Sequence, residues 1–405
     1  MSANLKILSI LALCAHGLNA QFDPNVYLGR LTTEAEVAAI QKRIEFLRTE
    51  DVSSPFVREV EVRARMRDLE TSPDDYRFRL SPLNPAERKA NQRYFDVLRQ
   101  QFESEKRVVW SNILTSRYLN LIRLAHIEAM ERVNRTALER YQNLIMSNNQ
   151  GEYSGKERIR LEKRVLFVNL DQSELKHDKE EVAYLIGKSV DFEGPLSLAG
   201  FNLISPESIA RSYRSLLADS LQNVLVHNEQ QKVRVREAEL EVNEKESFGD
   251  IGFVQAEYRG DNGNTAAERL GFQVGVSLPI VNPDRPDLQR RRLELIEEQY
   301  ELTEIETELE DEQFAHENLL KLRLRQYQRL DSTLTVIKTF DQAAINDVET
   351  LLEIEDFKHD LEVRMLSVYE DLLIEYIGLL EKRGLLVREP LINYLSENGD
   401  LIQLE

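Results

Sequence analysis

The sequence contains little proline, glycine or cysteine. Its 405 residues include 11 prolines, 16 glycines and one cysteine. That cysteine, Cys14, lies in the N-terminal segment, so no disulfide or cysteine-ligated metal can stabilise the rest of the chain. Few helix breakers and a charged fraction of 30% predict long amphipathic helices rather than a loop-rich fold.

Basic residues are outnumbered by acidic ones, 52 to 71, and catalytic groupings are scarce. The formal net charge is -19, which argues against a general nucleic-acid or anionic-lipid binder, because both need a basic face. The histidines after the N-terminal segment lie far apart, without the paired spacing of metal ligands. We therefore expect that the protein is not an enzyme and that it has no cofactor, no catalytic residue and no metal site. These histidines are His126, His177, His227, His316 and His359.

The N-terminus has the pattern of a secretory signal peptide. Lys6 supplies the positive charge, residues 7–15 the short apolar run, and Ala20 a plausible cleavage site. The alternative is a buried N-terminal helix. No later stretch approaches the ~20 consecutive apolar residues of a transmembrane helix, so membrane insertion would have to use β-strands. We predict a signal peptide over residues 1–20.

Two proline-free tracts, between Pro85 and Pro195 and between Pro286 and Pro390, predict two long helical hairpins. In the return helix of the first, Leu161, Val168, Leu175 and Val182 recur every seven residues, which favours a coiled coil. The second return helix has a similar stripe that includes Leu361, Met365, Val368, Leu372 and Leu379. The predicted helices cover residues 86–150, a second segment after the breaks at Gly151 and Gly155 that runs to about 186 with Gly187 as C-cap, 287–340 and 347–381.

The two hairpins belong to an internal repeat. Asn84-Pro85 recurs as Asn282-Pro283 at an offset of 198 residues, and Gly187 recurs as Gly384 at 197. Several matches at nearly one offset indicate duplication. We predict a first repeat over residues 21–200, a second over 201–385, and a C-terminal tail over 386–405.

Upstream of these matches the offset changes. Residues 58–62 resemble residues 236–240 at an offset of 178, which predicts that both segments are helical. The first repeat would then be about 20 residues shorter than the second, and only residues 71–83 would separate its helix from Asn84. We therefore expect that the first repeat lacks most of a β-hairpin and keeps a truncated strand segment.

A β-hairpin is predicted over residues 250–281 of the second repeat. Residues 250–259 and 270–281 flank a turn-rich loop at 260–264. In the second strand, apolar residues alternate with small or polar ones, as in strands that face lipid on one side and water on the other. A hairpin packed on a soluble core is the alternative. The predicted membrane-facing residues are Phe272, Val274, Val276 and Leu278.

This order of elements resembles the TolC-like outer-membrane efflux proteins. The resemblance covers roughly residues 33–384 and depends on the segment 275–283 leading into a helix, and on two return helices that end near Gly187 and Gly384. It implies a mainly α fold of two tandem repeats of long coiled helical hairpins with one β-hairpin, forming an α-barrel and a β-barrel in a homotrimer.

The resemblance also implies partners and sites. Its members act with a periplasmic adaptor (membrane fusion) protein and an inner-membrane transporter, with the helical part in the periplasm. Acidic residues beyond the second turn would form a pore constriction, although a solvated helix N-terminus explains them equally well. The expected constriction residues are Asp347, Glu349 and Glu353, and the expected adaptor-contact turns contain Asn149, Gln150, Gly151, Ala343 and Ala344.

Two functions are consistent with these features. The first is the outer-membrane channel of a tripartite efflux or type I secretion system, a passive export duct. The second is a periplasmic or membrane-peripheral scaffold of the same fold that forms no channel. The hairpin at 250–281 favours the channel, and the missing residues of the first repeat favour the scaffold. An adaptor protein fits less well, because no β-rich modules flank a single hairpin.

Overall fold

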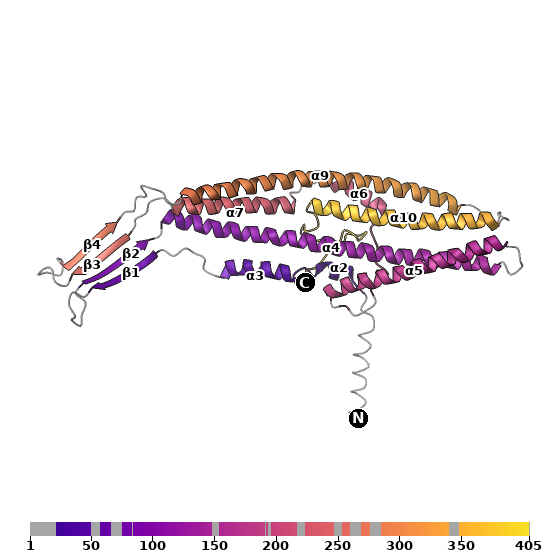
Figure 1. The fold of residues 1–405 in the computed structure, drawn as a ribbon, viewed down its shortest axis with the longest axis horizontal. Helices are drawn as coiled ribbons and strands as arrows, with labels where there is room; N and C mark the ends of the chain where they lie inside the picture. The colour runs from indigo at the N-terminus through magenta and orange to yellow at the C-terminus, as the bar shows by residue number, and fades with distance from the viewer. Residues whose placement is uncertain are drawn as a thin grey trace, which may run out of the picture. The chain divides into compact units, whose positions relative to one another are not determined.

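A computed structural model describes residues 22–49, 57–65, 75–82, 84–147, 154–190, 192, 196–216, 223–246, 253–259, 269–275, 285–339 and 348–404. Its helices are α2 (Pro24–Gly29), α3 (Ala35–Thr49), α4 (Pro85–Ser147), α5 (Gly155–Val190), α6 (Pro206–Leu216), α7 (Val224–Glu246), α9 (Arg285–Lys338) and α10 (Val348–Lys382). Its strands are β1 (Val57–Arg65), β2 (Asp75–Pro82), β3 (Phe253–Arg259) and β4 (Leu270–Gly275) (Figure 1). None of the described helices combines the length and hydropathy that a membrane crossing requires.

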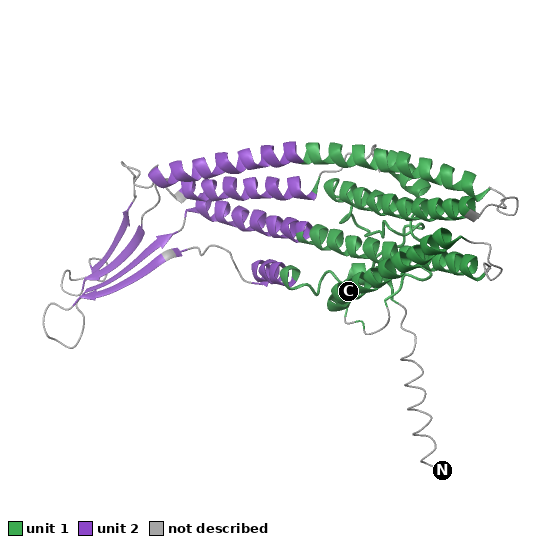
Figure 2. Cartoon of the chain, turned by 45° about the vertical axis from the view of Figure 1, so that its right-hand side comes forward, with its two compact units in different colours: residues 1–37, 109–223, 309–405 green, residues 38–108, 224–308 purple. Residues whose placement is uncertain are grey.

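The chain forms two compact units, each assembled from separate parts of the sequence (Figure 2). Unit 1 comprises residues 1–37, 109–223 and 309–405, and unit 2 comprises residues 38–108 and 224–308. The division of the sequence into repeats at residue 200 stays a prediction. The predicted signal peptide lies outside the described residues.

The predicted helical hairpins are confirmed, with local capping at their described starts. The Asn84 side chain accepts a hydrogen bond from the Ala86 amide at 2.9 Å, and Pro85 follows as the first helical residue of α4. At the start of α5, Ser154 and Glu157 form a reciprocal capping box. The turns between the paired helices lie outside the described residues.

The core of unit 1 includes a cluster contributed by α4, α5 and α10. Of the predicted stripe on α5, Leu161, Val168 and Val182 are buried, and Leu175 is half-buried. On α10, four of the five predicted stripe residues are buried, Met365 being the half-buried exception. The periodicity therefore identified the correct faces. The cluster consists of Ala137, Leu138, Tyr141, Leu161, Val168 and Leu352.

The two glycines expected to end the return helices behave differently. Gly384 follows α10 with a φ of 68°, and the Leu385 and Gly384 amides donate to the carbonyls of Leu380 and Glu381. These bonds form a Schellman motif, which favours glycine. Gly187, in contrast, lies inside α5, which continues to Val190. The prediction of a helix end at Gly187 was wrong, because glycine weakens a helix without forcing it to stop.

A buried arginine holds the N-terminal segment of unit 1 against α4. The side chain of Arg117 is only 3% exposed, and its guanidinium donates to the carbonyls of Tyr27, Leu28 and Arg30. It also pairs with Glu34 at 2.6 Å. The three carbonyls lie in and just after α2, where helical C=O groups lack intrahelical partners, so Arg117 serves as a C-terminal cap.

Residues 385–404 also pack within unit 1. Leu391 and Leu395 are buried, and the Tyr118 hydroxyl of α4 donates to the carbonyl of Ile392 at 3.0 Å. Two isolated bridges, Leu203 to Ser396 and Ile392 to Leu401, fix this segment further. The region expected as a tail is thus part of the core.

The four strands form one antiparallel sheet in unit 2, in the order β1-β2-β3-β4 (Figure 1). The first repeat therefore contains a complete hairpin, β1 and β2, paired from Val57 with Pro82 to Arg65 with Asp75. The predictions of one β-hairpin and of a truncated first repeat were wrong. The β3–β4 hairpin agrees with the predicted hairpin over its described residues.

The error arose at residues 58–62. In β1, Val60, Val62 and Ala64 alternate strictly with charged residues, which is the period of a strand. Residues 236–240 have similar charges but are built from strong helix formers without a valine, and they lie in α7. The β-branched valines thus distinguish the strand from the helix where the charge pattern does not.

Candidate functional site

One face of the sheet in unit 2 is apolar and exposed. From Val60 onward in β1, and throughout β2, β3 and β4, every even-numbered residue is apolar, and the register aligns these residues in rows across the four strands. Nine of them are exposed large side chains, which is unusual for a surface that water alone would cover. We name this surface the apolar face. It consists of Val60, Val62, Ala64, Tyr76, Phe78, Leu80, Val254, Ala256, Tyr258, Leu270, Phe272 and Val274.

The opposite face of the sheet is polar. Glu61 contacts Arg63 and lies 3.9 Å from Arg79, and Glu257 lies 3.5 Å from Arg77 and 3.1 Å from Arg259. These charges alternate along each strand with the apolar residues. The sheet is therefore amphipathic, with one surface suited to hydrocarbon and the other to water.

A glycine on the polar face makes room for an aromatic ring. Gly275 pairs with Phe253, and a Cβ atom at Gly275 would lie 2.3 Å from that ring. The Arg79 guanidinium lies 4.0 Å from the ring centroid on the same face. The ring thus covers the glycine and carries a cation–π contact, which helps to fix the register of β3 and β4.

The predicted membrane-facing residues lie on this sheet where they are described. Phe272 is 80% exposed and Val274 is 63% exposed, both on the apolar face. Val276 and Leu278 lie outside the described residues. The two outer strands, β1 and β4, are each paired on one side only in the described structure, so their free edges can pair with other strands.

A second candidate site lies in unit 1, where α10 faces α4 and α5. Asp356, whose side chain is 7% exposed, accepts a hydrogen bond from the Tyr141 hydroxyl of α4 at 3.0 Å. It also pairs with Arg160 and Arg164 of α5 at 3.2 and 3.1 Å. One carboxylate therefore connects all three helices. Burial, followed by the charge of Asp356, raises the pKa of the Tyr141 hydroxyl, which keeps it a hydrogen-bond donor.

Further ion pairs extend this connection along α10. Arg140 of α4 lies 3.4 Å from Glu355 and 3.7 Å from Glu362. Nearer the start of α10, Glu349 lies 3.8 Å from Lys156 of α5. We name the set the α10 ion-pair cluster. It consists of Arg140, Tyr141, Lys156, Arg160, Arg164, Glu349, Glu353, Glu355, Asp356 and Glu362.

The structure locates two of the three predicted constriction residues. Glu349 and Glu353 both belong to the α10 ion-pair cluster, and Glu353 lies 3.7 Å from Arg160. Asp347 lies outside the described residues, as do the predicted adaptor-contact residues Asn149, Gln150, Gly151, Ala343 and Ala344.

The centre of the cluster was not predicted from the sequence. Arg160 and Arg164 are four residues apart, a spacing that puts both side chains on one face of α5, and this was the available signal. Their shared partner, Asp356, is distant in sequence and could not be paired with them without the fold.

A group of carboxylates in unit 2 has the spacing of a cation site. Oxygen atoms of Glu229, Glu298 and Glu301 lie within 4.8 Å of one another. The Lys232 ammonium, however, lies 2.8 Å from Glu229. Burial alone would lower the pKa of Lys232, but the hydrogen bond and charge of Glu229 raise it. An internal cation thus already neutralises part of this group.

Comparison with known proteins yields structural matches only. No protein-family model matches the sequence, and no curated protein matches it. The outer membrane protein VceC of Vibrio cholerae is similar with a TM-score of 0.57 and 13% identity, over 89% of this chain and 96% of VceC. The CmeC outer membrane channel of Campylobacter jejuni gives a TM-score of 0.58 and 12% identity, over 93% of this chain and 86% of CmeC.

A third match is the open state of the MtrE outer membrane channel of Neisseria gonorrhoeae. Its TM-score is 0.56 with 11% identity, over 93% of this chain and 89% of MtrE. All three matches span most of both chains. The mainly α fold of long helical hairpins expected from the resemblance to TolC-like proteins is confirmed: this chain has the fold of outer-membrane channel proteins.

Proposed function

We propose that this protein is the outer-membrane channel subunit of an export system. It acts as a passive duct with no reaction of its own, and three copies assemble around one axis. The amphipathic sheet carries the proposal, because its apolar face is exposed and each of its outer strands has one unpaired edge in the described structure. Inside a membrane every backbone N–H and C=O group needs a hydrogen-bond partner, and a single copy cannot provide partners for the free edges of its outer strands.

If three copies join their sheets into one barrel, the apolar face can contact lipid and the free strand edges can pair. Four strands from each of three chains make twelve, an even number within the range of bacterial barrels. In such a barrel the apolar face contacts lipid and the polar face lines the lumen. The free edges of β1 and β4 would pair with those of neighbouring copies, which closes the sheet and leaves no edge exposed.

The long helices would occupy the periplasm in this assembly. There they would form the tunnel through which cargo reaches the barrel, and the helical turns would contact a periplasmic adaptor protein and, through it, an inner-membrane transporter. The structural matches to outer membrane channels support this arrangement. A tripartite efflux pump or a type I secretion system would provide such partners.

The acidic residues of α10 have a specific role in this proposal. Three copies of Asp347, Glu349 and Glu353 around the axis would form a constriction that attracts cations. The α10 ion-pair cluster would hold this constriction in place, because Glu349 and Glu353 lie against Lys156 and Arg160 of α5.

The observation that favoured a non-channel scaffold no longer applies. That hypothesis depended on a missing hairpin in the first repeat, and β1 and β2 supply the hairpin. The channel is therefore the function that the described structure supports best.

Membrane extraction tests the proposal with a matched pair of variants. Phe272→Asp puts a charge on the apolar face, whereas Gln273→Asp puts the same charge on the polar face of the same strand. A charge facing lipid near the bilayer centre costs about 2–4 kcal/mol per chain at most. We expect the protein with Gln273→Asp to resist a urea or carbonate wash of the outer membrane and that with Phe272→Asp to be depleted from it.

Conductance in planar bilayers provides the second measurement. The purified protein should migrate as a trimer and give discrete single-channel currents, and removing residues 253–280 should abolish both membrane retention and current. A protein that washes off the membrane, or gives no currents when it is retained, would refute the channel function. Equal retention of the two Asp variants would refute the assignment of the faces.

A further inference from the structure

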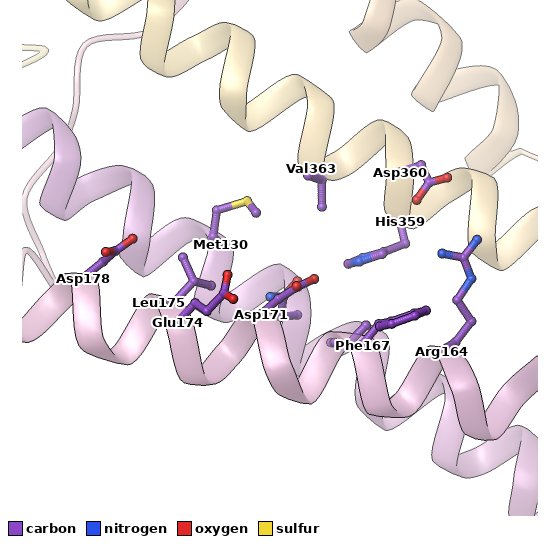
Figure 3. Close-up of a pocket in the computed structure, with 12 residues that line it drawn as sticks. Met130, Arg164, Phe167, Asp171, Glu174, Leu175, Asp178, His359, Asp360 and Val363 are labelled. Atoms are coloured by element: carbon purple, nitrogen blue, oxygen red, sulfur yellow. The ribbon is translucent and has the colours of Figure 1, made fainter.

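Unit 1 contains a pocket of about 330 Å³ between α4, α5 and α10 (Figure 3). This volume is at the lower end of the range for small-molecule sites. The lining combines apolar and polar side chains, and the apolar part includes Met130, Phe167, Leu175 and Val363. The pocket adjoins the α10 ion-pair cluster through Arg164, which contributes to both.

Two buried side chains that line the pocket have polar atoms without a hydrogen-bond partner in the described part of the chain. The Asn134 side chain is 1% exposed, and neither its amide nitrogen nor its oxygen has a hydrogen-bond partner among the described residues. His359 is 7% exposed, and its Nδ1 atom likewise has no partner there. An unsatisfied buried polar atom costs about 1–3 kcal/mol, so two such side chains at one pocket indicate that something else can satisfy them.

The charge at the pocket is negative. Asp171, Glu174 and Asp360 line it, and none of the three has an ion-pair partner in the described part of the chain. A fourth acid, Asp178, lies 3.5 Å from Arg123. The charge of Arg164 is engaged by Asp356 at 3.1 Å, so the pocket has an excess of unpaired carboxylates.

His359 adds an acceptor rather than a positive charge. Burial lowers its pKa and Arg164 lowers it further, against the opposing charges of Asp360, Glu362 and Asp171. A neutral imidazole has one nitrogen that accepts a hydrogen bond. In Figure 3 the ring extends from α10 toward α5, on the side of Asp171.

These groups favour an organic cation over a metal ion. Among the described residues, the acids and histidine of this pocket do not bring three ligand atoms within 4.8 Å of one another, as a bound metal would require. An ammonium group, in contrast, donates several hydrogen bonds to acceptors spread around it, and an attached hydrocarbon body would fill the apolar part.

We propose that this pocket binds a small organic ammonium compound, an amine with a short apolar body. Its cationic nitrogen lies near Asp171 and Asp360 and donates to Asn134 or His359, while its hydrocarbon contacts the apolar lining. This site lies between helices of one unit and is independent of the proposed channel function.

Calorimetric titration of the purified full-length protein with phenethylamine tests the proposal. Its neutral analogue, 2-phenylethanol, has nearly the same shape and measures the contribution of charge. We expect phenethylamine to bind at least about tenfold more tightly than 2-phenylethanol, because a charge-assisted hydrogen bond is worth more than a neutral one.

Two variants separate binding from folding. Asp171→Asn with Asp360→Asn should weaken phenethylamine binding about tenfold or more and leave 2-phenylethanol binding unchanged. Asn134→Leu should also weaken phenethylamine binding, while the melting temperature stays the same or rises, because the substitution removes an unsatisfied buried amide. Glu180→Gln, an exposed acid on α5 outside the pocket, is the matched control and should change neither.

Several results would overturn the proposal. They are no phenethylamine binding at millimolar concentration, equal affinity for the two analogues, or unchanged phenethylamine binding in the Asp171 and Asp360 variant. Saturable binding of Zn²⁺ or Mg²⁺ that the same variant abolishes, without amine binding, would identify a metal site instead.

Discussion

Replacing Asp356 should remove the polar contacts that connect α10 with α4 and α5 and so destabilise unit 1. Asp356→Leu removes the acceptor of the buried Tyr141 hydroxyl and the carboxylate partner of Arg160 and Arg164. An orphaned buried hydroxyl costs about 1–3 kcal/mol. The two arginine side chains are 37% and 36% exposed, so solvent screens them and their loss adds only about 1 kcal/mol. We expect a total loss of about 2–4 kcal/mol in the free energy of unfolding.

A double-mutant cycle isolates the hydrogen bond within that total. Tyr141→Phe alone should cost about 1 kcal/mol, because it removes the donor while Asp356 keeps both arginines. In the Asp356→Leu background the same substitution should be neutral or stabilising, because it removes a hydroxyl that has lost its partner. The predicted coupling energy is about 1–2 kcal/mol.

Chemical denaturation followed by far-ultraviolet circular dichroism measures these differences, since the chain is mainly helical. Glu353→Leu is the matched control, because Glu353 is 64% exposed and lies 3.7 Å from Arg160 on the same surface. It should change stability by less than about 0.5 kcal/mol. If Tyr141→Phe has the same cost in both backgrounds, Asp356 does not hold the Tyr141 hydroxyl, and the central contact of the cluster is wrong.

Three further predictions concern unit 1. Arg117→Met should lower the free energy of unfolding by about 3–5 kcal/mol in denaturation, because it leaves buried carbonyls and Glu34 without their partner. Because burial lowers the pKa of His359, the unfolded chain takes up the proton first, and stability is lost as pH falls through about 6.5. The melting temperature of the His359→Gln variant should therefore fall less on acidification than that of the wild type. Gly384→Ala should destabilise by about 1–2 kcal/mol, whereas Gly187→Ala, inside α5, should stabilise by up to about 1 kcal/mol; equal effects would contradict the two helix ends.

Most of the helical architecture could be predicted from the sequence, since proline exclusion and apolar periodicity are local signals. The predicted start of α4 at residue 86 and end of α10 at residue 381 each lie one residue from the observed bounds. The capping chemistry of Asn84 and the positive φ of Gly384 explain why these boundaries are marked in the sequence.

The first hairpin was missed because two signals conflicted. Residues 58–62 match residues 236–240 in charge, which indicates a repeated helix, whereas the alternating valines of residues 58–62 indicate a strand. The alternation was the better guide, because a strand with one face in contact with an apolar environment must place its apolar residues at every second position. β1 pairs with β2 in that register, with Val60 opposite Leu80 and Val62 opposite Phe78.

The candidate sites depend on contacts between residues distant in sequence. Glu349 and Glu353 could be identified as an acidic cluster, but their arginine and lysine partners lie on another hairpin, about 190 residues earlier. The same holds for the pocket, where Asn134 and His359 come from different helices. No periodicity within one helix predicts that an asparagine on its buried face will lack a partner.

The two return helices end differently, and this difference has a physical cause. After Gly384 the chain must turn sharply, because Leu385 and Leu386 are buried and residues 391–402 pack within unit 1. A Schellman motif provides that turn, and its left-handed residue favours glycine. After Gly187 the chain continues in α5 to Val190, whose carbonyl accepts a hydrogen bond from Arg30 at 2.8 Å. The first return helix is therefore capped by the Arg30 side chain from the N-terminal segment. Gly187 lies inside α5, where the helical backbone does not require a glycine.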